Sequence, residues 1–181
     1  MTENKASLTL IQAMKQRKLL LADIEELKAK INAHAADLDN EAPVYTDEVT
    51  QRKTVEGWLQ AIHDKLSKIE ELSLRIQKTN LETKVTIEIE PSRTVEKTIA
   101  AWVLRRRDLA NHEQLAWGLL NDRNLKDKTV PTSTGGSATV KVRRYFDPQV
   151  RDQKVTNFRR EPHLIDSILE TVNATTPLLE L

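Results

Sequence analysis

The sequence predicts a mainly α-helical protein, an elongated hairpin or bundle of long antiparallel helices with a small antiparallel β-ribbon. Three observations favour this fold class: apolar residues recur at heptad spacing, two short stretches alternate with a period of two, and only four Gly and six Pro interrupt 181 residues. Heptad spacing is typical of helices packed lengthwise, and alternation is typical of half-buried strands. We treat residues 1–181 as a single domain.

The first helix is expected over residues 7–39. Apolar side chains such as Leu10 and Leu21 mark one face of this stretch, with Lys and Glu between them. The connection that follows, residues 40–45, contains Pro43. So short a connection favours an antiparallel pair of helices.

The second helix is expected over residues 46–80, with Thr46 as its N-cap. At about 1.5 Å per residue it would be about 50 Å long. Trp58 lies beside the apolar seam and is a candidate interface anchor, because tryptophan is enriched in interface hot spots. The seam steps by four, three, four, three and then seven, with Ser73 in the last gap, and it comprises Val55, Leu59, Ile62, Leu66, Ile69 and Ile76.

Two alternating stretches predict the β-ribbon. Residues 84–90 place Val85, Ile87 and Ile89 on one face, and residues 139–146 alternate again. The polar face of the first stretch is acidic and that of the second is basic, which favours cross-strand pairing. We therefore expect the two strands to pair with each other, and we expect the Gly-Gly segment 126–137 to be a flexible loop.

Two further helices complete the expected fold. Residues 93–121 repeat the heptad spacing, with Arg106 and Glu113 on the seam. Residues 148–173 form a last helix that Pro162 is expected to break or kink. An extended tail, residues 174–181, ends in Pro-Leu-Leu-Glu-Leu.

Nothing in the sequence points to catalysis. The four His are far apart, Cys is absent, and there is no Gly-rich phosphate loop or nucleophile elbow, so we expect no enzyme, no cofactor and no metal site. No apolar run reaches the roughly 18–20 residues of a membrane span, and we see no signal peptide. We expect the chain to be made in the host cytosol, and to stay in the cytoplasm or join a virion.

Basic charge is concentrated in the middle of the chain. Residues 93–160 carry 15 Lys and Arg against 7 Asp and Glu, although the net charge of the whole is +1. One interpretation is ion pairing within a helix or between copies of the chain. The other is contact with the phosphate backbone of a nucleic acid, which needs the arginines on one exposed face.

Three segments resemble a known family. They are Leu74-Ser-Leu-Arg-Ile-Gln-Lys-Thr-Asn-Leu-Glu-Thr-Lys-Val85, Arg105-Arg-Arg-Asp-Leu-Ala110 and Leu164-Ile-Asp-Ser-Ile-Leu-Glu-Thr-Val-Asn173. In this order they resemble the septicolysin-like family of small, uncharacterised helical bacterial and phage proteins. The resemblance implies an N-terminal helical hairpin and a final helix that ends in asparagine. It implies no catalytic residue, because the family has no established active site.

We therefore expect a non-enzymatic structural or assembly protein, a subunit of a large homo-oligomer such as a bacteriophage virion, capsid- or tail-associated. Its partners would be its own copies and other virion proteins. The alternatives are a nucleic-acid-binding protein that uses the arginines, and a membrane-active toxin. The residues expected to bind partners are Trp58, Arg105, Arg106, Arg107, Arg143, Arg144, Pro177, Leu178, Leu179 and Leu181.

Overall fold

Residues 8–181 are described by a computed structural model, in which 62% of these residues are helical and two small antiparallel strand pairs occur. The prediction of a mainly α fold with a small antiparallel ribbon is confirmed. The described residues divide into two compact units. Unit 1 comprises residues 8–83 and 170–181, and unit 2 comprises residues 84–169.

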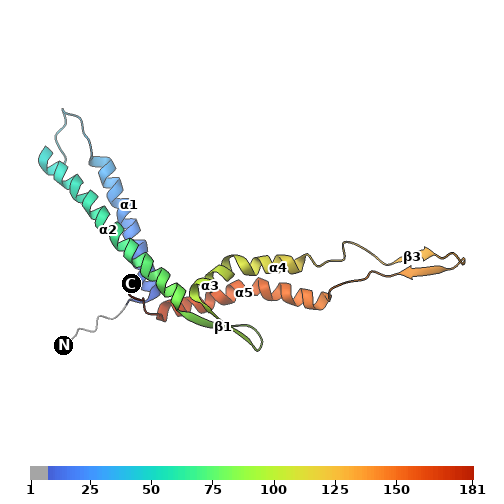
Figure 1. Ribbon diagram of the computed structural model, residues 1–181. Helices are drawn as coiled ribbons and strands as arrows, with labels where there is room; N and C mark the ends of the chain where they lie inside the picture. The colour runs from blue at the N-terminus through green and yellow to red at the C-terminus, as the bar shows by residue number, and fades with distance from the viewer. Residues whose placement is uncertain (1–7) are drawn as a thin grey trace, which may run out of the picture. The chain divides into compact units, whose positions relative to one another are not determined.

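Unit 1 contains the predicted helical hairpin. Helix α1 (Leu10–His34) and helix α2 (Glu48–Glu82) lie side by side in Figure 1. Lys65 of α2 forms an ion pair of 2.6 Å with Asp23 of α1. Nearer the connecting loop, the side-chain amide of Gln51 donates to the carbonyl oxygen of His34 at 2.9 Å. The two helices are therefore antiparallel.

The ends of these helices differ from the expected ones. Helix α1 ends five residues before position 39, and the expected start at residue 7 lies outside the described residues. Thr46 does not cap α2, because it has a φ of +52°. Asp47 is the N-cap, and one carboxylate oxygen accepts from the backbone N–H of Thr50 at 2.8 Å. This hydrogen bond holds the pKa of Asp47 below its usual value.

The end of the chain closes the base of the hairpin. The backbone N–H of Leu178 donates to the carbonyl of Leu8 at 2.7 Å, and the backbone N–H of Leu10 donates to the carbonyl of Thr176 at 2.9 Å. The side chain of Leu178 is buried. We call residues 176–180 the tail clasp.

The tail clasp also binds α2. The Arg75 guanidinium donates from Nε to the carbonyl of Leu179 at 3.1 Å and pairs with the carboxylate of Glu180. The hydroxyl of Thr79 accepts from the backbone N–H of Leu179 at 3.0 Å. Lys78 donates to the carbonyl of Glu180 at 2.8 Å. The tail is thus extended, as predicted, but it is joined to the hairpin of its own chain.

In unit 2, each strand pairs with its neighbour along the chain. Strand β1 (Lys84–Glu90) pairs with β2 (Arg93–Thr98), and β3 (Lys128–Pro131) pairs with β4 (Ser137–Val140). The predicted pairing of residues 84–90 with 139–146 is wrong. Closing a two-residue turn costs less chain entropy than bringing together strands about fifty residues apart.

The buried face of β1 is the predicted one. Val85 and Ile87 are buried, and Ile89 is half-buried at the end of the strand. The register shifts between Glu88 and Glu90, so a bulge lies next to the turn. A bulge redirects the side chains beside it, and here it precedes a charged residue that contacts α5.

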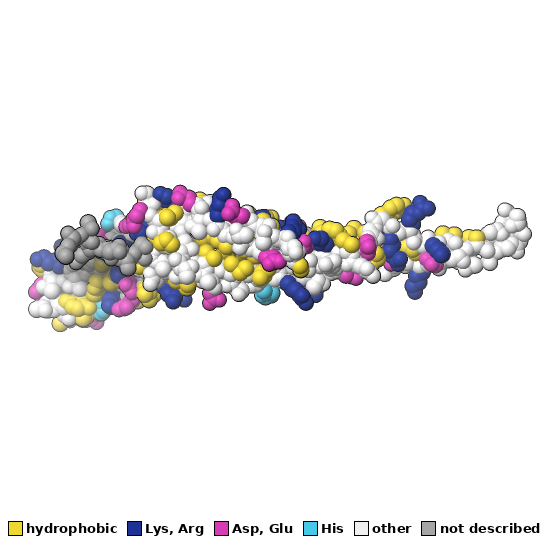
Figure 2. All heavy atoms as spheres, turned by 90° about the horizontal axis from the view of Figure 1, so that it is seen from below, with side chains coloured by type: hydrophobic (Ala, Val, Ile, Leu, Met, Phe, Trp, Pro, Cys, Tyr) yellow, Lys and Arg dark blue, Asp and Glu magenta, His cyan; other side chains and the backbone are white. Residues whose placement is uncertain are grey.

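The expected flexible loop 126–137 contains β3 and the first residue of β4. The turn between the strands is closed by the backbone N–H of Thr132, which donates to the carbonyl of Gly136 at 2.9 Å. Gly135 adopts a φ of +80°, which favours glycine. Between Lys128 and Lys141 no residue is charged, and Figure 2 shows the far end of this hairpin without charged side chains.

The expected helix 93–121 starts late, because residues 93–98 form β2. Helix α3 (Ile99–Leu104), the π-helical turn η1 (Arg105–Leu109) and helix α4 (Ala110–Gly118) follow one another without a break. Trp102 is fully buried, and its indole N–H donates to the carbonyl of Val85 at 2.8 Å. This bond joins α3 to β1.

Helix α5 (Pro148–Thr175) continues through Pro162, so the predicted break is wrong. Proline removes the N–H that would bond the carbonyl of Phe158, which costs stability within a helix. The buried side chains of Glu161 and Ile165, on either side of the proline, anchor the helix against the rest of unit 2. Packing of this kind can offset the lost hydrogen bond.

Candidate functional site

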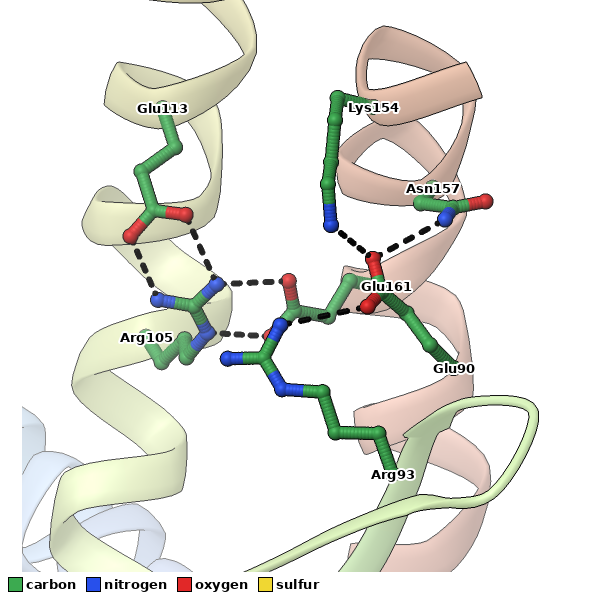
Figure 3. Close-up of polar contacts among 7 residues, drawn as sticks. All are labelled: Glu90, Arg93, Arg105, Glu113, Lys154, Asn157 and Glu161. Carbon is green, nitrogen blue, oxygen red and sulfur yellow. Dashed lines mark hydrogen bonds and ion pairs between the residues drawn. The ribbon is translucent and has the colours of Figure 1, made fainter. Parts of the chain in front are cut away.

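A cluster of six charged side chains and one amide lies where η1, α4, α5 and the β1–β2 hairpin meet (Figure 3). We call it the arginine cluster. Its members come from stretches far apart in sequence: Glu90, Arg93, Arg105, Glu113, Lys154, Asn157 and Glu161.

Arg105, the first residue of η1, binds two carboxylates at once. Its Nη2 donates to Glu161 Oε2 at 2.8 Å, and its Nε donates to the other oxygen of the same carboxylate. Its two terminal nitrogens donate to Glu113 at 3.0 and 3.2 Å. The hydrogen bonds to Glu161 and then Glu113 raise the pKa of Arg105 above its usual value. The pKa of Glu113 is correspondingly lowered by its hydrogen bonds to Arg105.

Glu90 is the second centre of the arginine cluster. It accepts from Lys154 at 2.7 Å and from the side-chain amide of Asn157 at 3.1 Å, both on α5. Arg93, across the turn, donates at 3.2 Å. The bond from Lys154, followed by that from Asn157, lowers the pKa of Glu90 to about 2. The carboxylate therefore joins the β1–β2 hairpin to α5.

The chemistry open to this cluster is limited by its pairing. The pocket beside it has a volume of about 120 Å³, room for a few water molecules. Glu90, Glu113 and Glu161 each accept from Arg or Lys, so none is an uncommitted base, and a cation ligand would have to displace a bound side chain. Within residues 8–181, no group of three or more His, Cys, Asp or Glu is placed to hold a metal. The arrangement fits the joining of elements.

The other predicted arginines have separate partners. Arg106 pairs with Asp166 of α5, and Arg107 donates from Nε to the carboxylate of the adjacent Asp108 at 2.9 Å. Arg144 donates two hydrogen bonds, of 2.7 and 2.6 Å, to the carboxylate of Asp122. The arginine run is thus divided among several acids.

Arg143 is exposed, and it forms no ion pair with any of the described residues. Arg105, in contrast, is buried within unit 2. The five predicted arginines therefore do not form the single exposed face that a phosphate backbone needs.

Trp58 and the tail residues contact their own chain. The ring of Trp58 lies 5.8 Å from that of Tyr45 and 5.9 Å from that of His34, a small aromatic group at the tip of the hairpin. In the tail clasp Leu178 is buried and Leu179 half-buried. The other two predicted tail residues, Pro177 and Leu181, are exposed.

The hairpin leaves part of its apolar seam uncovered. Leu59 is 54% exposed and Leu66 is 49% exposed, although both belong to the predicted seam. They are seven residues apart and share their heptad position with Ser73 and Asn80. On α1, Met14 and Leu21 are also exposed and seven apart. We call Met14, Leu21, Leu59 and Leu66 the hairpin surface.

A groove lies at the base of the hairpin surface. It has a volume of about 480 Å³. Three apolar, two basic and one amide side chain line it. Its lining is Met14, Arg17, Lys18, Leu21, Ile76 and Asn80, and we call it the base groove.

The fold is similar to one solved structure of unknown function. It is the crystal structure of a functionally unknown conserved protein from Corynebacterium diphtheriae, which shares 18% sequence identity with this chain. The alignment covers 96% of this chain and 99% of that protein's chain, with a TM-score of 0.54. At that identity the likeness shows the fold alone. No protein-family model and no curated protein matches the chain.

Among residues 8–181, no helix has both the length and the apolar character that crossing a bilayer requires. The septicolysin-like resemblance stays a prediction from the three sequence segments.

Proposed function

We propose that the protein is a non-enzymatic structural subunit that assembles with copies of itself through the hairpin surface. The observation that carries this proposal is the exposure of Leu59 and Leu66 at heptad spacing on a long helix. A heptad seam of this kind is typical of helices that pack against partner helices along their length.

A two-helix hairpin covers only one side of each helix. The side chains of Leu59, Leu66, Met14 and Leu21 need further helices to bury them, as in a four-helix bundle. Burying one leucine side chain contributes about 1.5–3 kcal/mol. In a symmetric pair of copies each of these residues is buried twice. A few such side chains are therefore enough for association in the micromolar range.

The nucleic-acid alternative loses its main support, since Arg105, Arg106 and Arg144 already bind carboxylates of this chain. Arg105, whose three guanidinium nitrogens all bind carboxylates, would have to give up an ion pair to bind a phosphate. Assembly as part of a bacteriophage virion, capsid- or tail-associated, rests on the sequence resemblance and is kept here as a prediction.

The first test removes the two exposed leucines of α2. The chain of 20.7 kDa should migrate as an oligomer at micromolar concentration, and the double variant Leu59→Gln/Leu66→Gln should dissociate to the monomer. We expect the dissociation constant to rise at least about 100-fold, since four leucine side chains leave the interface of each dimer. Light scattering coupled to size-exclusion chromatography measures the mass directly.

Leu19→Gln is the matched control. Leu19 is exposed on α1, but it lies five residues from Met14 and hence about 140° around the helix from the hairpin surface. This variant should keep the oligomeric mass. A wild-type chain that stays monomeric at every concentration would refute the proposed function, as would a double variant that assembles normally.

A further inference from the structure

We propose that two copies pack antiparallel, so that the hairpin tip of each copy enters the base groove of the other. This inference rests on the proposed function and specifies how the copies meet. The occupant of the base groove is then the loop between α1 and α2 of a second copy. Three observations carry it: the charge of the tip, the charge of the groove and the position of the exposed leucines.

The tip is acidic and carries an exposed apolar residue. Residues 35–48 contain five Asp or Glu and no Lys or Arg. Leu38 is 64% exposed, and it stands between Asp37 and Asp39. A leucine flanked by two carboxylates needs a partner that is apolar at its centre and basic around it.

The base groove has that complementary character. Residues 10–22 of α1 contain Lys15, Arg17 and Lys18 and no acid. Met14, Arg17, Lys18 and Leu21 follow the spacing i, i+3, i+4, i+7 and therefore lie on one face of α1. Arg17 and Lys18 have no ion-pair partner among the described residues. Leu38 of a second copy can enter the groove while its two neighbouring carboxylates meet the basic pair.

The exposed leucines lie where an antiparallel pair would bring them together. Between Glu48, at the tip, and Ile76, in the base groove, the middle of α2 is residue 62. Leu59 lies three residues before this position and Leu66 four residues after it. A two-fold axis at the midpoint places Leu59 of one copy beside Leu66 of the other, because a symmetric interface pairs residue i with j and j with i. A parallel pair would instead bring two acidic tips together, which repel each other.

Two charge-reversed variants test the arrangement. Variant one, Asp37→Lys/Asp39→Lys, makes the tip basic, and variant two, Arg17→Glu/Lys18→Glu, makes the base acidic. Each alone should associate at least about tenfold more weakly than the wild type at low salt, since each places like charges in contact at both ends of the pair. A one-to-one mixture should recover wild-type affinity, because each tip then faces a groove of opposite charge. Sedimentation velocity at micromolar concentration measures this recovery.

The control reverses two charges on the far sides of the same helices. Lys30 lies about 160° around α1 from Met14, and Lys68 about 200° around α2 from Leu66, at 100° per residue. Lys30→Glu/Lys68→Glu should associate as the wild type does, and circular dichroism should show unchanged helix content in all variants.

The outcomes separate the two proposals. A wild-type chain that never associates refutes self-assembly itself. If the wild type associates and the Leu59→Gln/Leu66→Gln variant does not, but the mixture shows no recovery, then self-assembly stands and the antiparallel arrangement is overturned. Equal association by the charge-reversed variants and the wild type overturns it in the same way.

Discussion

Arg105 shows how a charge is accommodated inside unit 2. Its guanidinium lies above the ring of Phe158, 5.8 Å from the ring centre, and its nitrogens bind the carboxylates of Glu161 and Glu113. Taking charges out of water is costly, and good geometry with saturated hydrogen bonds offsets that cost. Removing one carboxylate would leave the positive charge of Arg105 buried without the hydrogen bonds that offset its desolvation.

Glu161→Gln should therefore destabilise the fold strongly. Glu161 is 4% exposed, so its loss leaves Arg105 short of a buried carboxylate. We expect the free energy of unfolding to fall by about 3–5 kcal/mol, as is typical when a buried ion pair loses one member. Urea denaturation followed by circular dichroism measures the change.

Glu113→Gln is the comparison for this variant. The side chain of Glu113 is 47% exposed, so water can replace part of its interaction with Arg105. Glu113→Gln should therefore lower the free energy of unfolding clearly less than Glu161→Gln does. Equal losses for the two variants would show that burial of Glu161 is not what makes the pair important.

Glu90 provides a prediction about pH. Its pKa is lowered from 4.5 to about 2, so the folded state favours the charged carboxylate. The stabilisation is complete above pH 4.5 and is lost as the pH falls towards 2. Glu90→Gln should thus be less stable than the wild type at pH 7, and this difference should shrink between pH 4.5 and 2.

Chemical denaturation of both chains over that pH range measures the difference directly. A gap that stays constant down to pH 2 would show that Glu90 contributes by packing and not by its charge.

At the scale of elements, the heptad pattern predicts α1 and α2 well, because packing over many turns leaves a long periodic signal. It fails in residues 93–121. The apolar residues from Val95 onward fit a heptad, but Arg93 to Thr98 is rich in β-branched residues, and the Pro91-Ser92 turn makes it pair with β1. Local strand pairing takes precedence over the helix pattern.

The π-turn is a second case. The sequence places Arg106 and Glu113, seven apart, on one seam. In the structure Arg105, eight residues before Glu113, is the residue that binds it. A π-turn adds one residue to a helical turn and so shifts the register by one, which periodicity alone cannot show.

The tail clasp gives a prediction at the scale of elements. Leu178→Ala should destabilise unit 1 by about 2–5 kcal/mol, because the leucine is buried at the base of the hairpin. Leu181→Ala, at an exposed position in the same tail, should have little effect. Thermal denaturation compares the two. Similar losses from both would mean that burial of Leu178 is not the source of the clasp's stability.

At the scale of the whole molecule, the sequence predicts the fold class and the hairpin, and it predicts neither the two units nor the arginine cluster. The cluster depends on pairs that are distant in sequence: Arg105 and Glu161 are 56 residues apart, and Glu90 and Lys154 are 64 apart. No local pattern brings them together. The incomplete covering of Leu59 and Leu66 is likewise invisible in the sequence. Periodicity shows which residues share a face, and only the structure shows whether that face is covered.

The tail clasp has a consequence for how the protein is made. Unit 2 is continuous in sequence, whereas unit 1 needs residues 170–181 to meet Leu8 and Leu10. A ribosome releases residues 170–181 only after it has synthesised all of unit 2. The base of the hairpin therefore stays open while unit 2 is being translated, and the bonds that close it can form only afterwards.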